Sequence, residues 1–147
     1  MATLRLENFL PYRLNRAAAA ASMQLSSVYR RSFGLTIPEW RTLATLGQFE
    51  ERTAKQIGGH SAMHKTKVSR AVAALERRRW LTRRTDPKDR RLEHLSLTAT
   101  GRSQYRSLAP QMLAFEDELM ARLSADDRAA LVKGLAALEV ALEIGSR

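Results

Sequence analysis

Residues 65–98 have the sequence KTKVSRAVAALERRRWLTRRTDPKDRRLEHLSLT, in which a helical pattern is followed directly by a hairpin pattern. In the helical part, Val68, Val72 and Leu75 fall on one face when residues are placed about 100° apart. Basic and hydroxyl side chains occupy the opposite face. The pattern therefore predicts an amphipathic helix over residues 65–79.

The hairpin pattern consists of two short strands, residues 80–84 and 91–97, around the turn-forming sequence TDPKDR at residues 85–90. The second strand alternates in polarity, which is typical of a sheet with one face on a core. One side carries Leu92, His94 and Ser96, and the other carries Glu93, Leu95 and Leu97. We expect His94 to be a polar surface residue.

A second, shorter helical pattern precedes residue 65. Thr53-Ala-Lys-Gln56 has the spacing of a capping box and predicts the start of a short helix. The glycines at 58 and 59 weaken or end that helix, so residues 58–61 are the expected tight link to the helix over 65–79. Two helices joined in this way form a helix-turn-helix.

Further helical patterns lie on both sides of this region. Apolar residues recur at steps of three and four over residues 6–33, which predicts a helix that stops at Gly34. A second capping box, Thr36 with Glu39, predicts a helix over residues 38–48. The apolar side chains that this helix should bury are Trp40, Leu43 and Leu46.

The last third of the chain predicts two more helices. Pro110 lies inside the first and should bend it, and Ser124 can cap the second. The terminal helices carry more apolar stripes than one small lobe can bury alone, which predicts a homodimer. The residues expected at its interface are Leu10, Leu14, Leu131, Leu135, Leu138 and Leu142.

Positive charge is concentrated in the middle of the chain. The 147 residues carry a net charge of +10. Residues 52–93 contain 13 Lys or Arg and 4 Asp or Glu, a balance of +9, so the flanks are almost neutral. A basic block between neutral flanks predicts a polyanionic partner, and with a helix-turn-helix this partner is double-stranded DNA.

Composition excludes several other classes of protein. No apolar run is long enough to cross a membrane, and the N-terminus lacks the apolar core of a secretion signal, so we expect a cytoplasmic protein. The absence of cysteine removes disulfides, thiolate nucleophiles and cysteine-based metal sites. No phosphate-binding loop or nucleophile motif is present, so we expect neither enzymatic activity nor a cofactor.

One pair of residues has the spacing of metal ligands on a helix. His60 and His64 are four residues apart. The predicted link between helices falls between them, and no carboxylate or cysteine completes a ligand set. We therefore expect no metal site.

The outward face of the helix over 65–79 has the chemistry to contact DNA. Arg70 suits a guanine edge in the major groove, because its paired donors match the two guanine acceptors. Later arginines should bind phosphates, which supply affinity without sequence information. A basic but functionless surface helix is the alternative. The expected contacts are Lys65, Thr66, Lys67, Ser69, Arg70, Arg77 and Arg78.

The adjacent hairpin explains why arginines stand near a turn. An arginine at a hairpin tip can enter the narrow, electronegative minor groove beside such a helix. Arg91 is placed for this role, and Asp89 can brace its guanidinium through a charge-assisted hydrogen bond. Lys88 and Arg90 complete the expected hairpin contacts. A solvated turn without function is the alternative.

These motifs together resemble the MarR (multiple-antibiotic-resistance regulator) family of winged helix-turn-helix transcription factors. The resemblance covers nearly the whole chain, and TKVSRAVAALE at residues 66–76 is one of its most specific parts. The other is the hairpin pattern formed by Asp89, Arg91, Leu95, Leu97, Thr98 and Gly101. The chain departs from the family at three places: Arg79 stands where glycine is common, His64 where a better helix cap is common, and Gly58-Gly59 where helix formers are usual.

The resemblance implies a mainly α fold of α+β type, with residues 1–147 forming a single domain. Residues 36–100 would form the winged helix-turn-helix lobe, whose hairpin is the wing, and residues 6–33 and 102–145 the dimerisation helices. It implies a homodimer on a pseudo-palindromic operator, acting as a repressor. The lack of cysteine excludes the thiol-oxidation sensing of one branch of the family.

Members of the family often bind small phenolic or carboxylate effectors. Tyr12, Arg16 and Trp40 are the residues that could line such a site, as two aromatic surfaces and a cation. Core aromatics with a surface arginine are an equal alternative. A different function for the same basic block is that of an architectural protein that coats DNA without choosing sites.

Overall fold

The computed structural model describes residues 1–145, which form two compact units divided between Leu108 and Ala109. Each unit is described by itself. In the part of the chain that is described, none of the helices combines the length and apolar character needed to cross a membrane. The first unit contains the elements η1 (Leu6–Asn8), α1 (Leu10–Phe33), α2 (Ile37–Gln48), α3 (Ala54–Ser61), α4 (Lys65–Arg77), β1 (Leu81–Thr85) and β2 (Glu93–Leu97), and the beginning of α5 (Ala99–Met120).

The predicted N-terminal helix over residues 6–33 is wrong at its start. Residues 6–8 form a separate 3-10 turn, and α1 begins at Leu10 after an extended Phe9. A continuous helix would need an N–H from Pro11, which proline lacks, and the proline ring would clash with the carbonyl of Glu7. The predicted end is confirmed, since Gly34 adopts a left-handed φ of 62° and donates its N–H to the carbonyl of Arg30.

Both predicted capping boxes are present. Thr36 accepts from the N–H of Glu39 at 3.4 Å, and the Glu39 carboxylate accepts from the N–H of Thr36 at 2.9 Å. Thr53 and Gln56 make the same reciprocal pair at the start of α3. These bonds satisfy N–H groups that the first turn of a helix leaves free, so they fix where α2 and α3 begin.

The link between α3 and α4 differs from the prediction. Helix α3 continues through both glycines to Ser61, and the turn falls at Ala62, which has a left-handed φ of 52°. Gly58 allows this turn to fold back, because a Cβ there would lie 3.1 Å from the carbonyl oxygen of Met63. His64 then caps α4, its Nδ1 accepting from the N–H of Thr66 at 3.3 Å.

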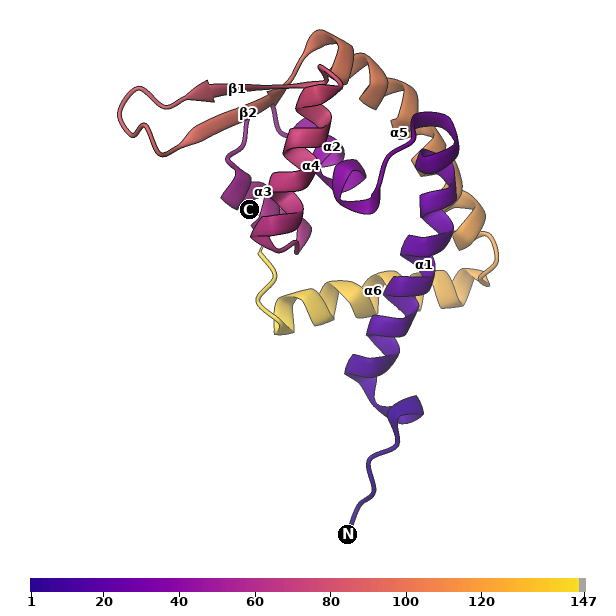
Figure 1. Cartoon of the computed structure of the whole chain (residues 1–147). Helices are drawn as coiled ribbons and strands as arrows, with labels where there is room; N and C mark the ends of the chain where they lie inside the picture. Colours follow the sequence, from indigo (N-terminus) through magenta and orange to yellow (C-terminus); the bar gives the residue numbers. More distant parts are fainter. Residues whose placement is uncertain (146–147) are drawn as a thin grey trace. The chain divides into compact units, whose positions relative to one another are not determined.

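The core of the first unit lies between α2, α3, α4 and the hairpin. The predicted inner face of α4 is confirmed, since Val68, Ala71, Val72 and Leu75 are all at most 2% exposed. Figure 1 shows α4 beside α2 and α3, with the hairpin extending away from them. The side chains that complete this core include Leu35, Leu43, Leu46, Ile57, Leu81 and Leu95.

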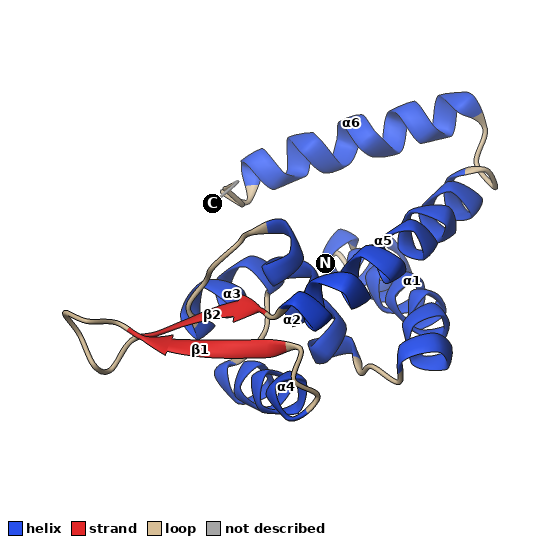
Figure 2. Ribbon diagram, turned by 90° about the horizontal axis from the view of Figure 1, so that it is seen from above, coloured by secondary structure: helices blue, strands red, loops and turns tan. Residues whose placement is uncertain are grey.

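The hairpin has the predicted topology, but β1 is shifted by one residue and β2 begins two residues later than predicted. β1 and β2 pair antiparallel from Leu81 opposite Leu97 to Thr85 opposite Glu93. A loop over residues 86–92 joins them, and Figure 2 shows this loop at the end of the hairpin that points away from α2, α3 and α4. The backbone of Leu95 also pairs with that of Arg52 in both directions, at 2.9 and 3.0 Å. This bridge fastens β2 to the segment between α2 and α3.

A close joint connects α4, the hairpin and α5. Arg79, between α4 and β1, has a left-handed φ of 61°, a conformation that glycine adopts without strain and other residues adopt rarely. The Thr98 hydroxyl donates to the Arg79 carbonyl at 2.7 Å and accepts from the N–H of Gly101 at 3.0 Å. A Cβ on Gly101 would lie only 2.0 Å from the Trp80 carbonyl oxygen. Only glycine lets α5 begin this close to the hairpin.

The second unit contains the rest of α5 and α6 (Ala125–Ala141). Helix α5 continues through Pro110, and the bend expected there stays a prediction. The predicted cap of α6 is confirmed, because Ser124 accepts from the N–H of Asp127 at 3.1 Å. No residue of α6 is buried, although the helix carries the leucine stripe. Leu131 and Leu135 are each 44% exposed.

The Gly101 joint can be tested by alanine substitution. Gly101→Ala should destabilise the fold by about 1–3 kcal/mol, because the methyl group meets backbone that cannot move aside. Gly59→Ala is the matched control, since it also lies in a helix but has open space around it. The control should be neutral or more stable by about 0.5–1 kcal/mol. Urea denaturation at one protein concentration measures both, and equal stability of the two variants would contradict the account.

Candidate nucleic-acid interface

The outward face of α4 is available to a partner. The residues predicted to contact DNA on this helix are all exposed, namely Lys65, Thr66, Lys67, Ser69, Arg70 and Arg77. Among the residues that the structure describes, no acidic side chain pairs with any of these cations. The opposite face is buried, so the helix cannot rotate to hide them. The face therefore presents free donors from the N-terminal end of α4 to its last turn.

Arg78 differs from the other arginines that follow this face. Its Nη1 donates to the Phe33 carbonyl at 2.6 Å, and its Nη2 donates to the Gly34 carbonyl at 2.7 Å. Its guanidinium also lies 5.0 Å from the centre of the Trp80 ring. The prediction that Arg78 is a free phosphate contact is therefore corrected, because its donors satisfy the carbonyls at the end of α1.

The hairpin loop positions Arg91 as expected. Asp89 accepts from Arg91 through the backbone N–H at 3.0 Å and through Nε at 3.2 Å. Its Nη2 also donates to Asp89, at 3.4 Å, yet the Arg91 side chain is 91% exposed and stays open to a partner. Lys88 and Arg90 are exposed in the same loop. The predicted brace is thus present, and it restricts the arginine without covering it.

Arg83 is a contact that the sequence pattern did not predict. It donates to Glu76 at the end of α4 through Nε at 2.7 Å and to Glu93 on β2 through Nη1 at 2.8 Å. The hydrogen bonds to Glu93 and Glu76 raise the pKa of Arg83 above its ordinary value. The three side chains join α4 to both strands, so Arg83 positions the hairpin and is not a free cation.

His94 is also placed differently from the prediction of a polar surface residue. It is half-buried, and its Nε2 lies 2.8 Å from a carboxylate oxygen of Asp86. The pairing register of the hairpin could have indicated this contact. Arg84 lies opposite His94, so position 86, two residues after Arg84, is the diagonal neighbour of His94 on the same face of the hairpin. Its second contact, with Glu51, comes from outside the hairpin and has no signature in the sequence.

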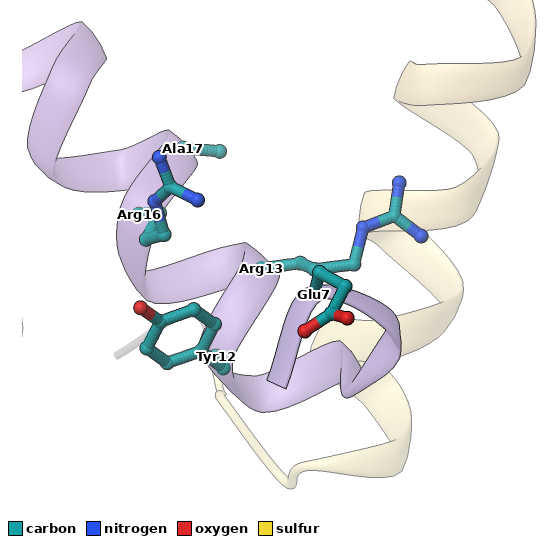
Figure 3. A pocket seen from close by; sticks show the side chains of 5 residues that line it. All are labelled: Glu7, Tyr12, Arg13, Arg16 and Ala17. Carbon is teal, nitrogen blue, oxygen red and sulfur yellow. The ribbon is translucent and has the colours of Figure 1, made fainter. Parts of the chain in front are cut away.

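The three residues predicted to hold an effector are not brought together. Tyr12 and Arg16 line an open hollow of about 350 Å³ with Glu7, Arg13 and Ala17, as Figure 3 shows. The Arg16 guanidinium lies 5.9 Å from the centre of the Tyr12 ring. Trp40 instead stacks on the buried ring of Tyr29, with centroids 5.8 Å apart and planes inclined by 17°. Trp40 is therefore removed from the predicted set.

Neither histidine of the 60/64 pair is arranged as a metal ligand. His60 packs edge-on against Phe49 with centroids 5.1 Å apart, and His64 caps α4. Within residues 1–145 no group of three or more histidine or acidic side chains is placed to hold a metal ion.

Comparison with known proteins agrees with this geometry. The profile of the MarR family matches residues 33–92. The HTH-type transcriptional regulator YwoH of Bacillus subtilis (strain 168) is 31% identical over 98 residues, covering 67% of this chain and 71% of YwoH. The MarR family transcriptional regulator SPO1453 of Silicibacter pomeroyi DSS-3 is 30% identical, with a TM-score of 0.79 over 97% of this chain and 98% of that chain.

A more distant protein shares the fold. BpsR of Bordetella bronchiseptica, whose DNA binding is regulated by 6-hydroxynicotinic acid, has a TM-score of 0.80 at 20% identity, over 94% of this chain and 98% of that chain. The winged helix-turn-helix geometry and the two relatives at 30% and 31% identity together define the class of protein. The chain belongs to the MarR family of transcription regulators, which are DNA-binding regulators and not enzymes.

The distinction between Arg78 and Arg77 can be measured. Arg78→Ala should lower the free energy of unfolding by about 1–3 kcal/mol, because two carbonyls lose a charged donor. Arg77→Ala removes the neighbouring exposed arginine and should change stability by less than about 0.5 kcal/mol. Urea denaturation compares the two. An Arg78→Ala protein as stable as Arg77→Ala would show that the capping contact contributes nothing.

Proposed function

We propose that this chain is a sequence-specific DNA-binding regulator that acts as a homodimer on a pseudo-palindromic operator. It represses transcription and leaves the DNA when it binds a small aromatic or carboxylate effector. The observation that carries the proposal is the free, donor-bearing face of α4 beside a hairpin whose tip arginine is braced and exposed.

Helix α4 supplies the base contacts in this proposal. Thr66, Ser69 and Arg70 lie on its outward, N-terminal part, where a helix inserted into the major groove meets base edges. Arg70 donates two parallel hydrogen bonds to a guanine, while Lys65, Lys67 and Arg77 bind phosphates. Hydroxyl and guanidinium groups on this face favour a sequence-specific regulator over an architectural protein, because phosphate binding alone does not need them.

The wing supplies the second contact. Arg91 enters the minor groove beside the major-groove segment that α4 occupies, with Asp89 limiting its orientations. Lys88 and Arg90 bind the flanking phosphates. Since the minor groove is narrowest in A·T-rich DNA, the wing favours A·T pairs outside the bases read by α4.

The terminal helices form the dimer. A helix of 17 residues without any buried residue has no reason to be stable alone, so the leucine stripe of α6 requires a partner surface. A second copy of the chain supplies it, together with exposed Leu10 and half-buried Leu14 of α1. Residues 6–33 and 102–145 are thus assigned to dimerisation and residues 36–100 to DNA binding.

The effector site is assigned to the hollow on α1. Arg16 offers a cation to a carboxylate, and Tyr12 offers an aromatic face and a hydroxyl. Glu7 in the same hollow would repel a second negative charge, so a ligand with one carboxylate fits best. The aromatic acid that regulates BpsR has this chemistry within the same fold.

Selection of bound duplexes from random DNA at near-physiological salt tests the class. A two-fold symmetric consensus is expected, whereas selected duplexes without a consensus would favour the architectural protein.

Arg70→Ala should weaken binding to the consensus duplex by about 1–3 kcal/mol and relax the base preference at one position in each half-site. Arg91→Ala should instead remove the A·T preference at the outer edges. If both variants lose affinity uniformly on all sequences, neither residue reads bases or groove width.

Dimerisation is tested with charges in the leucine stripe. Leu135→Asp with Leu138→Asp should place unpaired carboxylates in an apolar interface, at a cost of several kcal/mol, and sedimentation should show monomers or aggregates. Val140→Asp is the control, because Val140 is 79% exposed on the other side of α6 and its variant should remain a dimer. A well-folded dimer in the double variant would refute the assignment.

A further inference from the structure

The wing loop, residues 86–92, contains two carboxylates that are turned inward. Asp86 and Asp89 are half-buried, whereas the other residues of the loop are exposed. The loop lies at the end of the hairpin that points away from α2, α3 and α4 (Figure 2), so its shape depends on bonds made within the hairpin. The side chain of Asp86 accepts three such hydrogen bonds.

Two of the three bonds fold the loop back onto Asp86. Its Oδ1 accepts from the N–H of Lys88 at 2.8 Å and from the N–H of Asp89 at 2.9 Å. This is an Asx turn, in which a short side chain takes the place of a backbone carbonyl as the acceptor. Pro87 supports the same turn, because its ring fixes φ at about −65°. Asp86 therefore sets the shape of the first half of the loop.

The third bond fastens Asp86 to β2. Its Oδ2 lies 2.8 Å from Nε2 of His94. An ionised carboxylate only accepts, so the imidazole donates its Nε2–H, which a neutral ring can do. This bond is the first of the causes that lower the pKa of Asp86 to about 2, followed by the two backbone N–H groups. The carboxylate is therefore ionised at neutral pH, with both oxygens accepting hydrogen bonds.

The remaining bonds of the loop carry this shape to Arg91. The N–H of Asp86 donates to the carbonyl of Leu92 at 2.9 Å, and the N–H of Leu92 donates to the carbonyl of Asp89 at 2.9 Å. The Asp89 carboxylate accepts from the backbone N–H and Nε of Arg91. Asp89 is thus held through its N–H, its carbonyl and its carboxylate. The place of the Arg91 guanidinium depends on Asp89, and the place of Asp89 depends on Asp86.

We propose that Asp86, anchored by His94, is a positioning residue for DNA binding, which fixes the wing loop in the shape that presents Arg91 to the minor groove. The inference rests on the proposed function in one respect, that the wing contacts DNA. A loop ordered before binding loses less conformational entropy on the operator. In a disordered loop the guanidinium would reach phosphates as readily as the groove, so the preference for a narrow groove would weaken.

Geometry, and not charge, is the reason for an acid at this position. A carboxylate beside DNA repels phosphates, so the charge of Asp86 works against affinity. Asp86→Asn removes the charge, keeps an oxygen for the Asx turn, and its amide can donate to the other neutral form of His94. Asp86→Glu keeps the charge, but its extra methylene group moves the carboxylate out of the turn. His94→Phe keeps a ring of similar size and removes the donor to Asp86.

The first test uses the full-length protein without DNA. Heteronuclear NMR relaxation of the amides at 88, 89 and 91 should report an ordered loop in the unmodified chain and in Asp86→Asn. The same amides should be mobile in Asp86→Glu and, to a smaller degree, in His94→Phe. Lys88→Ala is the control, because only the backbone N–H of Lys88 takes part in the turn, and its loop should stay ordered. An Asp86→Glu or His94→Phe loop as ordered as that of the unmodified chain would overturn the proposal.

The second test measures binding to the duplex obtained by selection, with its outer flanks changed from A·T to G·C. Asp86→Glu should reduce the preference for A·T flanks by about three- to tenfold and approach the ratio of Arg91→Ala, while Asp86→Asn keeps the preference. Lys88→Ala should weaken binding to both duplexes by the same factor, as expected of a phosphate contact. The base preference at the half-site positions read by α4 should remain in every variant.

A flank preference that Arg91→Ala removes and Asp86→Glu retains would overturn the proposal. An equal loss of that preference in Asp86→Asn and Asp86→Glu would also overturn it, because the Asx turn would then not be the cause. If Arg91→Ala itself leaves the flank preference unchanged, the role of the wing in the proposed function fails. The relaxation measurements still decide, without DNA, whether Asp86 orders the loop.

Discussion

The burial of one face of α4 is the constraint on which the interface depends. Val68, Val72 and Leu75 have almost no exposed surface, so rotating the helix would expose three apolar side chains at a cost of several kcal/mol. This fixes the direction of every other residue of α4. Arg70 points outward because its neighbours in the helical wheel point inward, and a helix with one buried face can present only one face to DNA.

The wing depends on α4 through a small number of short contacts. Thr98 and Gly101 fasten the far end of the hairpin to the backbone of Arg79 and Trp80. Arg83 ties both strands to the end of α4. Because these contacts are short and directional, the position of the hairpin loop follows from that of the helix.

Arg78 extends this connection to α1. Its guanidinium spans from the end of α4 to the last carbonyls of α1, the helix that also carries Tyr12 and Arg16. A displacement of α1 would therefore act directly on the C-terminal end of α4. This gives the proposed effector hollow a physical route to the DNA-binding face within the first unit.

Local chemistry made much of the fold predictable from the sequence. The capping boxes at Thr36 and Thr53, the Gly34 stop and the inner face of α4 depend on residues within one or two turns of each other. The position of the turn after α3 was predicted wrongly from the glycine pair. Packing of α3 overrides the weak helix propensity of Gly58, so the helix continues to Ser61.

The long-range contacts could not be predicted in this way. Arg78 reaches carbonyls 44 and 45 residues earlier, and no pattern distinguishes it from the arginines on either side. His94 finds Glu51 only because the backbone of Leu95 pairs with Arg52. Trp40 was assigned to an effector site by its chemistry, but its half-buried ring is stacked on the buried ring of Tyr29. Such contacts depend on the three-dimensional fold, and the spacing of residues along the sequence does not indicate them.

The most direct test of the account is the structure of the protein bound to a selected duplex. The account predicts α4 in the major groove, with the Arg70 guanidinium within hydrogen-bonding distance of a guanine edge, the Arg91 guanidinium in the adjacent minor groove, and Arg78 still bound to the carbonyls of Phe33 and Gly34. A complex in which the outward face of α4 touches only phosphates, or in which Arg78 leaves α1 to contact DNA, would contradict it.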